Sequence, residues 1–441
     1  MDARGRRRQT GELFATSVKE SAAPMRIAKL TESEAAKFFA RRNSHDAAAE
    51  RIASRIVADV RRGGDVALFR WVSKLDGQRL TPSTLWVSRA EIKKARENVS
   101  RELLRAMEHA VKNIRRVAEQ QLPRPWTITV EPGVRVGQRV TPLDAICCYI
   151  PGGRFSLFST LLMTAIPAQI AGVKRIVVTC PKASPALLAA AEMLGVTEIA
   201  RIGGAQAIGA FAFGTQSVPR VDKICGPGNR YVTAAKRLVS NDCAIDMPAG
   251  PTEVLILATG GDHRYIAADI LAQAEHDPEA VALLVTTSMR LAKTFSAELT
   301  KQLQDLPKTN PAWTSLRRGS AILVAPSLDS AIRFANRVAP EHLSIPFAEK
   351  SLLEKLPEAG SVFLGPWSAQ PIGDYASGTN HVLPTSGWAR TRGGLSVLDF
   401  VKCSSTQEIS RAGLKRLAPV VSAMARAEGL EAHARAVEVR K

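Results

Sequence analysis

Hydrophobic and polar positions change rhythm along the chain, and this change predicts how it is organised. From about residue 31 to 121 apolar residues recur at helical spacing, as in HDAAAERIASRIVADVRRGGD, which should end at Gly63 and Gly64. Ser88 and Glu91 form a capping box that opens a further helix. From about residue 145 short apolar runs alternate with helical segments. Since alternating strands and helices build parallel sheets covered on both faces, the pattern predicts an α/β protein.

The alternation runs twice, which indicates two doubly wound α/β units side by side. The strands expected in the first unit are AICCYIP, RIVVTCP, EIARI and VDKICGPGN. The strands expected in the second are EVLILAT, AVALLVTT, SAILVAP and GSVFLG. After Pro384 the chain becomes rich in glycine and is then expected to be helical to its end.

These patterns place the domain boundaries. Residues 1–24 are expected to be a disordered extension, or to precede a true start at Met25. The remaining segments are a helical N-terminal region that packs with the second α/β unit (25–125), the first unit (126–245), the second unit (246–384) and a C-terminal tail (385–441).

Composition narrows the class of protein. The net charge of +19 raises nucleic acid as a partner, but the basic residues are dispersed among acidic ones and form no dense run with aromatic residues, so we expect none. No apolar stretch is long enough to span a membrane, and no secretory signal is visible, which favours a cytoplasmic protein. The six cysteines form no CxxC pair and lie mostly in strand-like runs, so they are expected to be buried thiols in a reducing compartment.

Four of the seven histidines lie in polar clusters, QAEH, PEHL, GDYASGTNH and EGLEAH. In the first of these, Gln273 and His276 share one face at the end of an apolar helix. Imidazole with carboxylate or amide oxygen, and without thiolate, suits a borderline divalent ion such as Zn²⁺. Glu341 and His342 are adjacent after a proline, on an expected loop, where they could serve two proton transfers or have no role.

Three glycine-rich turns each follow a strand and open a helix: PGG at 151–153, GGAQAIG at 203–209 and GPGN at 226–229. Backbone N–H groups at such positions can hold the phosphates of a nucleotide or another anion, and ordinary tight turns are the alternative. None matches the GxGxxG fingerprint of dinucleotide-binding units.

The chain resembles the histidinol dehydrogenase family from about Met25 to its end. The strings that carry the resemblance, in order, are CYIPGG, GGAQAI, VDKICGPGN, DMPAGPTEVL, AQAEHDPEA, APEHLSI, AGSVFLG, GDYASGTNHVLPT and EGLEAHARAVEVR. The resemblance implies two incomplete Rossmann-like doubly wound units, the first binding NAD and the second holding the catalytic zinc. It also implies oxidation of L-histidinol through the aldehyde to L-histidine with two NAD⁺ and one Zn²⁺ per subunit. A homodimer is implied, in which the tail completes the partner's site.

The resemblance also assigns residues. It implies that the zinc ligands are Gln273, His276, Asp374 and His433, and that Glu341 and His342 are the catalytic acid/base pair. His381 and Glu428 are implied as further substrate contacts beside Thr252, His342 and the zinc ligands. The implied NAD contacts are Tyr149, Gln206 and Asn229.

Two positions depart from the family's usual pattern. Thr252 stands where many members have serine, and Arg154 stands where many have a small residue. Relatives that oxidise sulfonated diols share similar PGGR and GPTE strings, so another polar alcohol is the alternative substrate.

Overall fold

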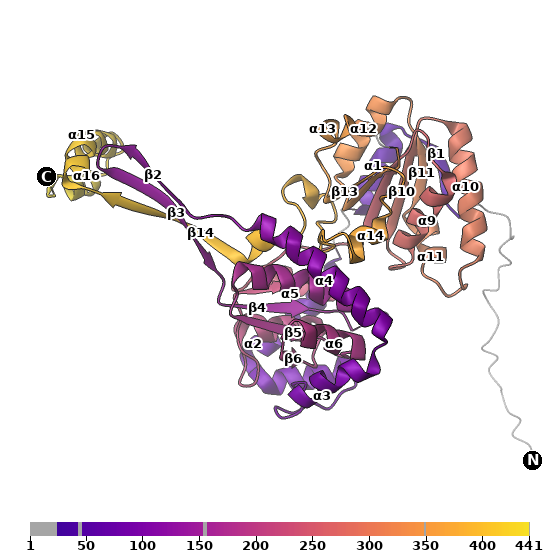
Figure 1. Cartoon of the computed structure of the whole chain (residues 1–441), viewed down its shortest axis with the longest axis horizontal. Helices are drawn as coiled ribbons and strands as arrows, with labels where there is room; N and C mark the ends of the chain where they lie inside the picture. The colour runs from indigo at the N-terminus through magenta and orange to yellow at the C-terminus, as the bar shows by residue number, and fades with distance from the viewer. Residues whose placement is uncertain (1–23, 43–45, 153–156, 348–349, 441) are drawn as a thin grey trace, which may run out of the picture.

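The computed structural model describes residues 24–42, 46–152, 157–347 and 350–440, and it contains two parallel sheets and one antiparallel sheet (Figure 1). The expected disorder of residues 1–23 and the environment of Arg154 lie outside the described residues. No helix in the described part of the chain combines the length and the apolar character needed to cross a membrane.

The first α/β unit is built on a five-stranded parallel sheet of order β6-β5-β4-β7-β8. Its strands are β4 (Ala145–Tyr149), β5 (Arg175–Thr179), β6 (Glu198–Ala200), β7 (Lys223–Cys225) and β8 (Ala244–Ile245). Its own helices are α5 (Phe158–Ala171), α6 (Pro185–Met193), α7 (Gly204–Phe213) and α8 (Arg230–Val239). Because side chains alternate along a strand, Ile146 and Cys148 enter one apolar core while Cys147 and Tyr149 enter the other. Both faces of the sheet are therefore buried.

The second unit is built on a six-stranded parallel sheet of order β1-β11-β10-β9-β12-β13. Its strands are β1 (Arg26–Lys29), β9 (Glu253–Leu257), β10 (Val281–Thr286), β11 (Ala321–Val324), β12 (His342–Ile345) and β13 (Ser361–Leu364). Its helices are α1 (Glu32–Arg42), α9 (His263–Ala274), α10 (Met289–Gln304), α11 (Ala312–Arg318), α12 (Leu328–Val338), α13 (Leu352–Lys355) and α14 (Gln370–Tyr375). Cores lie on both faces of this sheet as well. The two doubly wound units confirm the fold class expected from the alternating pattern.

The helical N-terminal region does not pack where the sequence analysis placed it. Only β1 and α1 join the second unit, whereas α2 (Ala47–Asp76), α3 (Arg89–Ala95) and α4 (Arg101–Gln121) pack on the first. Their apolar stripes complete the two cores of the five-stranded sheet, whose own helices are too few to cover it. The helix expected to end at Gly63 and Gly64 is instead kinked at Gly64 and continues to Asp76, and the Ser88–Glu91 capping box is present.

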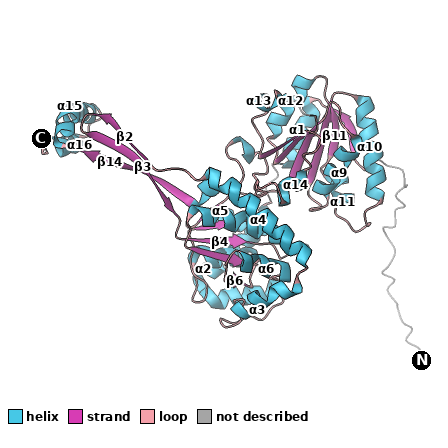
Figure 2. Ribbon diagram, viewed as in Figure 1, coloured by secondary structure: helices cyan, strands magenta, loops and turns pink. Residues whose placement is uncertain are grey.

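A third element, here called the arm, consists of a three-stranded antiparallel sheet and two terminal helices. Its strands are β2 (Trp126–Glu131), β3 (Val134–Pro142) and β14 (Val401–Ile409), and its helices are α15 (Arg411–Ala427) and α16 (Glu431–Glu438). The arm's strands lead away from both α/β units to the helical tip (Figure 2). The expectations that residues 126–142 belong to the first unit and that the tail is helical to its end were therefore wrong, because β14 pairs with β3.

Five of the six thiols are buried as expected, and Cys403 is not. Cys147, Cys148, Cys180, Cys225 and Cys243 are free and buried, while Cys403 is exposed on β14. Burial raises the pKa of the Cys148 thiol to about 12, so this thiol is protonated and packs as an apolar group.

Candidate active site between the two α/β units

Glu341 and His342 lie at the amino end of a central strand of the second sheet. His342 opens β12, which pairs in parallel with β9 and places His342 opposite Val254. Both side chains are buried, and the expected loop holds only for Glu341, because the four-residue strand begins at His342. The Glu341 carboxylate accepts hydrogen bonds at Oε2 from Thr252 Oγ1 (2.6 Å) and from the Glu253 backbone N–H (2.8 Å). No hydrogen bond from a described residue ends on its Oε1.

The contacts of His342 fix its tautomer. Its Nδ1 lies 3.1 Å from the Glu253 carbonyl oxygen, which can only accept, so the proton of the neutral ring is on Nδ1. Nε2 is buried without a hydrogen-bond partner among the described residues, and Asp374 Oδ1 lies 3.6 Å from it. A neutral His342 therefore presents an unprotonated nitrogen to its surroundings.

Burial and neighbouring charge act on the two pKa values. Burial raises the pKa of Glu341, although His342 and the hydrogen bond from Thr252 oppose the shift. Burial alone would lower the pKa of His342, but the carboxylates of Glu341 and Asp374 outweigh it, and the pKa lies above its usual value. Both shifts favour a group that accepts a proton, which is the requirement for a general base.

Gln273, His276 and Asp374 come together at this same edge of the sheet. Gln273 lies in the last turn of α9, whereas His276 lies just beyond the end of the helix, so the two do not share a helical face as expected. Both still lie near the amino ends of the strands, and Asp374 lies in α14. Gln273 Nε2 donates to Thr252 Oγ1 (2.5 Å), and its Oε1 accepts from Gln370. His276 Nδ1 lies 2.9 Å from the Ala272 carbonyl oxygen, which leaves its Nε2 as the unprotonated nitrogen of the neutral ring.

The donor set of one chain fits a zinc ion only in part. His276 and Asp374 both line the cavity described next and offer the nitrogen and oxygen donors that zinc takes. The Gln273 amide stands beside them but is engaged in hydrogen bonds. Among the described residues no three His, Cys, Asp or Glu side chains are grouped closely enough to hold a metal. A tetrahedral site needs four ligands, so the chain supplies an incomplete set.

A cavity of about 170 Å³ joins these groups to the first unit. The second unit contributes Thr252, His276, Glu341, His342 and Asp374. The first unit contributes Thr160 of α5 and the Gly226–Pro227–Gly228 turn after β7. The cavity therefore lies between the carboxyl edge of one sheet and the amino edge of the other.

His381 links the two units across this cavity. Its Nδ1 lies 2.9 Å from the Asp374 carbonyl oxygen, and its Nε2 lies 3.2 Å from Thr160 Oγ1. Burial lowers the pKa of His381, although Asp374 opposes the shift, so the ring is a neutral hydrogen-bonding group. Sequence reasoning missed Thr160, because a threonine inside an apolar helix shows no pattern of its own.

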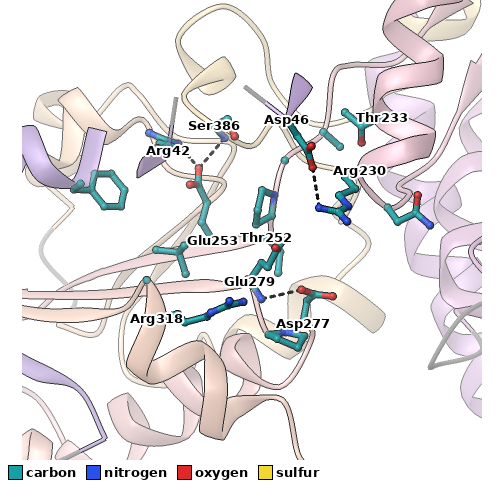
Figure 3. Close-up of a pocket in the computed structure, with 18 of the residues that line it drawn as sticks. Arg42, Asp46, Arg230, Thr233, Thr252, Glu253, Asp277, Glu279, Arg318 and Ser386 are labelled. Atoms are coloured by element: carbon teal, nitrogen blue, oxygen red, sulfur yellow. Dashed lines mark hydrogen bonds and ion pairs between the residues drawn. The ribbon is translucent and has the colours of Figure 1, made fainter. Parts of the chain in front are cut away.

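A larger cleft of about 1080 Å³ lies on the other side of residues 249–252 (Figure 3). Thr252 lines both spaces. Arg42, Glu253 and Ser386 line the larger cleft only, and Figure 3 shows the Glu253 side chain directed to the other two. Burial raises the pKa of Glu253 to about 7, although Arg42 opposes the shift. Sequence reasoning missed this pair, because residues 211 positions apart carry no shared motif.

The three residues expected at the cofactor lie at the carboxyl edge of the first sheet, but in two places. Tyr149 ends β4, and its buried hydroxyl accepts a hydrogen bond from the Gly204 N–H (3.0 Å) at the start of α7. Gln206 is fully buried nearby, and its amide donates to Asp76 (3.1 Å). Asn229 caps α8 and lines the larger cleft. Neither Tyr149 nor Gln206 lines the two cavities.

The turn after β7 marks the point where the strand order reverses. β4 pairs with β5 on one side and with β7 on the other, and ligands of doubly wound sheets bind outside the carboxyl ends at such a point. Gly226 has φ +118, and a Cβ there would collide with the Tyr149 carbonyl. The fully buried Lys236 donates to the Gly226 carbonyl, and Asp246 accepts from the Gly226 N–H (2.7 Å). The buried Lys236–Asp246 ion pair thus binds both the carbonyl and the N–H of Gly226.

Glu428 and His433 do not reach the site in this chain. Both are exposed at the tip of the arm, which extends away from the two α/β units (Figure 1). They line neither cavity.

Comparison with known proteins agrees with this architecture. The sequence model of the family described as histidinol dehydrogenase matches residues 39–441. The histidinol dehydrogenase of Methanosarcina barkeri is 44% identical over 94% of this chain and 97% of its own length, and that of Halalkalibacterium halodurans is 48% identical over 87% and 92%. The crystal structure of histidinol dehydrogenase from Elizabethkingia anophelis superposes with a TM-score of 0.89 and 38% identity, over 96% of this chain and 99% of that one. The chain therefore belongs to the histidinol dehydrogenase family of oxidoreductases.

Proposed function

We propose that the chain catalyses the zinc- and NAD-dependent four-electron oxidation of L-histidinol, through L-histidinaldehyde, to L-histidine. This reaction forms the last steps of histidine biosynthesis, which we place in the cytoplasm. The observation that carries the proposal is the buried Glu341–His342 pair, whose Oε1 and Nε2 are left without partners among the described residues beside a cavity between two units. Membership of the family supports the substrate.

His342 is the base for the alcohol. Its Nδ1–H is held by the Glu253 carbonyl, so Nε2 is the atom that takes the hydroxyl proton. Bound NAD⁺ supplies the hydride acceptor for each of the two oxidations. Protonated His342 gives this proton to the aldehyde oxygen as water adds, which frees Nε2 to take the hydroxyl proton of the hydrated aldehyde in the second oxidation, since both oxidations begin from an O–H group.

Glu341 is the base for the water. Thr252 and the Glu253 N–H hold its Oε2, and Oε1 takes a proton from the water that adds to the aldehyde carbon. Because burial raises its pKa, the carboxylate is a stronger base than an exposed one. One hydration between two deprotonations accounts for a carboxylate and an imidazole on adjacent residues.

The zinc would be held by Gln273, His276 and Asp374 of one chain and by His433 of a second copy. Zinc would supply a Lewis-acid anchor for the nitrogen atoms of the substrate. The incomplete donor set within one chain supports a ligand from elsewhere. Thr252, His381 and the second copy's Glu428 would complete the substrate contacts, together with His342 and the zinc ligands.

The first unit would bind NAD through Tyr149, Gln206 and Asn229. The glycine turn at the strand-order reversal supports this placement, because backbone can approach a dinucleotide closely where no Cβ intervenes. The second unit, 246–384, would then be the catalytic and zinc-binding unit.

The arm supports the proposal of a homodimer with shared sites. Its strand β2 exposes Trp126, Ile128 and Val130, and its helices expose Met424 and Val439, a set of large apolar side chains that a monomer rarely leaves in water. We propose that the arm docks on a second copy and brings Glu428 and His433 to that copy's site.

The function is tested by measuring NADH formation by the purified, zinc-loaded protein. We expect two NADH per L-histidinol consumed and L-histidine as product, with far lower kcat/KM for a sulfonated diol of similar size. If the sulfonated diol were the better substrate, histidinol oxidation would be the wrong assignment. Thr252, whose methyl group serine lacks, would then be the first residue to examine.

The shared site is tested by refolding two inactive variants together, His276→Ala and His433→Ala. A hybrid dimer would contain one site with both changes and one with neither. Random mixing makes about half of the dimers hybrid, so about a quarter of the wild-type activity should return. Hybrid dimers seen by mass spectrometry without any activity would mean that the arm serves its own chain.

A further inference from the structure

One residue holds both members of the catalytic pair through its backbone. The N–H of Glu253 donates to Glu341 Oε2 (2.8 Å), and its carbonyl oxygen lies 3.1 Å from His342 Nδ1. The orientation of the carboxylate and the tautomer of the imidazole therefore both depend on where the Glu253 peptide units lie. A displacement of this short segment would move both catalytic groups together.

The side chain of Glu253 is fixed from the opposite direction. Its Oε1 accepts a hydrogen bond from Arg42 Nη2 and another from the Ser386 N–H (3.1 Å), as Figure 3 shows. The Arg42 and Glu253 side chains are only 8% and 6% exposed. Two buried charges carry a large desolvation penalty, so this pair is a poor device for stability alone.

Arg42 also binds the segment that leads into the catalytic pair. Its Nη1 donates to the Val338 carbonyl, at the last residue of α12 and three positions before Glu341. Arg42 thus connects the segment that carries Glu253 with the segment that carries Glu341. It does so from the larger cleft, and neither Arg42 nor Glu253 lines the cavity where the substrate would lie.

We propose that the buried Arg42–Glu253 ion pair is a positioning device that sets the geometry of Glu341 and His342 from behind the active site. The proposal rests on the proposed function for the roles of those two residues. Arg42 and Glu253 do not line the cavity beside Glu341 and His342, and they act on that pair through the two Glu253 peptide groups and the Val338 carbonyl.

The test compares Arg42→Met with a matched control, Arg390→Met. Arg390 donates to the carbonyl of Arg337, one residue before the carbonyl that Arg42 binds, but among the described residues no hydrogen bond or ion pair joins it to Glu253. In single-turnover assays Arg42→Met should slow the oxidation of histidinol and of histidinaldehyde by similar factors, at least tenfold each. The KM values for histidinol and NAD⁺ should change less than threefold, and bound zinc should be retained. Arg390→Met should stay within twofold of the wild type in every one of these quantities.

A second variant keeps the proposal testable if Arg42→Met does not fold. Glu253→Gln keeps the shape and both backbone contacts and removes the charge, so it should slow both half-reactions in the same way but less. A third variant, Arg42→Lys, keeps a cation at the site. It should therefore retain more of the wild-type rate than Arg42→Met does. A purely structural pair would lower the thermal midpoint and leave kcat unchanged in every folded variant, and that result would overturn the proposal.

A readout without turnover separates this proposal from the proposed function. In protein with ¹⁵N-labelled imidazoles, the His342 signal, assigned by its loss in His342→Asn, should report a hydrogen-bonded Nδ1–H. Arg42→Met should shift that signal, and Arg390→Met should not. An unshifted signal overturns the positioning role whether or not histidinol is the substrate, whereas a wild-type protein that does not oxidise histidinol overturns the proposed function alone.

Discussion

Replacing Thr252 by valine would remove a hydroxyl that connects the carboxylate base to the metal-binding edge. Thr252 Oγ1 donates to Glu341 Oε2 (2.6 Å) and accepts from Gln273 Nε2 (2.5 Å), and valine fills nearly the same volume. A hydrogen bond to a charged group contributes about 1.5–3 kcal/mol. The hydrogen bond stabilises the ionised carboxylate, so without it the ionised fraction of Glu341 at pH values below its pKa should fall by about 10- to 150-fold, and the rate of the step that uses this base should fall with it.

The affected step is the hydration and oxidation of histidinaldehyde, so the measurement is a single-turnover reaction of supplied aldehyde with NAD⁺. The hydrogen bond from Thr252 lowers the pKa of Glu341 against the effect of burial. Its loss raises that pKa further, and since Glu341 acts as a base only when deprotonated, the acid limb of the pH–rate profile should move to higher pH.

Thr252→Ser is the matched control, because it keeps the hydroxyl and removes only the methyl group. It should retain the wild-type pH profile. An aldehyde rate within threefold of the wild type in Thr252→Val, with an unmoved acid limb, would refute the role given to this hydroxyl.

Further predictions concern the metal, the division of labour and the buried charges. His276→Ala should lose most bound zinc by elemental analysis and its dehydrogenase activity, while circular dichroism stays close to the wild type; full zinc occupancy would show the ligand assignment to be wrong. Glu341→Gln should slow the oxidation of aldehyde more than that of histidinol, whereas His342→Asn should slow both; equal effects of Glu341→Gln on the two would contradict their separate roles. Lys236→Met leaves the buried Asp246 carboxylate without its cation, so we expect the free energy of unfolding to fall by about 3–5 kcal/mol. Denaturant titration measures this change, and a loss below about 1 kcal/mol would mean that the pair is not buried as described.

The sequence predicted much of the fold because strand and helix periods are local properties. The runs AICCYI and VLILA are almost continuously apolar, as expected of strands covered on both faces, and both lie in the interior of parallel sheets. The sequence did not reveal which sheet the N-terminal helices cover. An apolar stripe on α2 or α4 predicts that one face of the helix is buried, but it does not indicate which sheet that face covers.

The candidate site was predictable where its residues share one short segment. Helical spacing indicated Gln273 and His276 as a pair. The structure ends α9 at Ala274, so His276 lies outside the helix, but both residues lie at the same edge of the sheet as Glu341. The strand β12 was missed although HLSI alternates polar and apolar residues, because the alternation covers only four residues and the preceding Pro340 and Glu341 indicated a loop. Contacts such as Arg42 to Glu253 depend on the whole fold and leave no local signal.

The pairing of β3 with β14 has a consequence for the order in which the chain can fold during synthesis. β14 pairs with β3 along its whole length, from Val401 opposite Pro142 to Ile409 opposite Val134. Ribosomes add about 5–20 residues per second, so on the order of 10 to 50 s separates the two strands. Through that interval β3 keeps an unpaired edge next to the exposed apolar face of β2, which is a template for pairing with another chain. Nascent chains are therefore most exposed to aggregation after both α/β units have been made, and a chaperone that shields residues 126–142 would act at that stage.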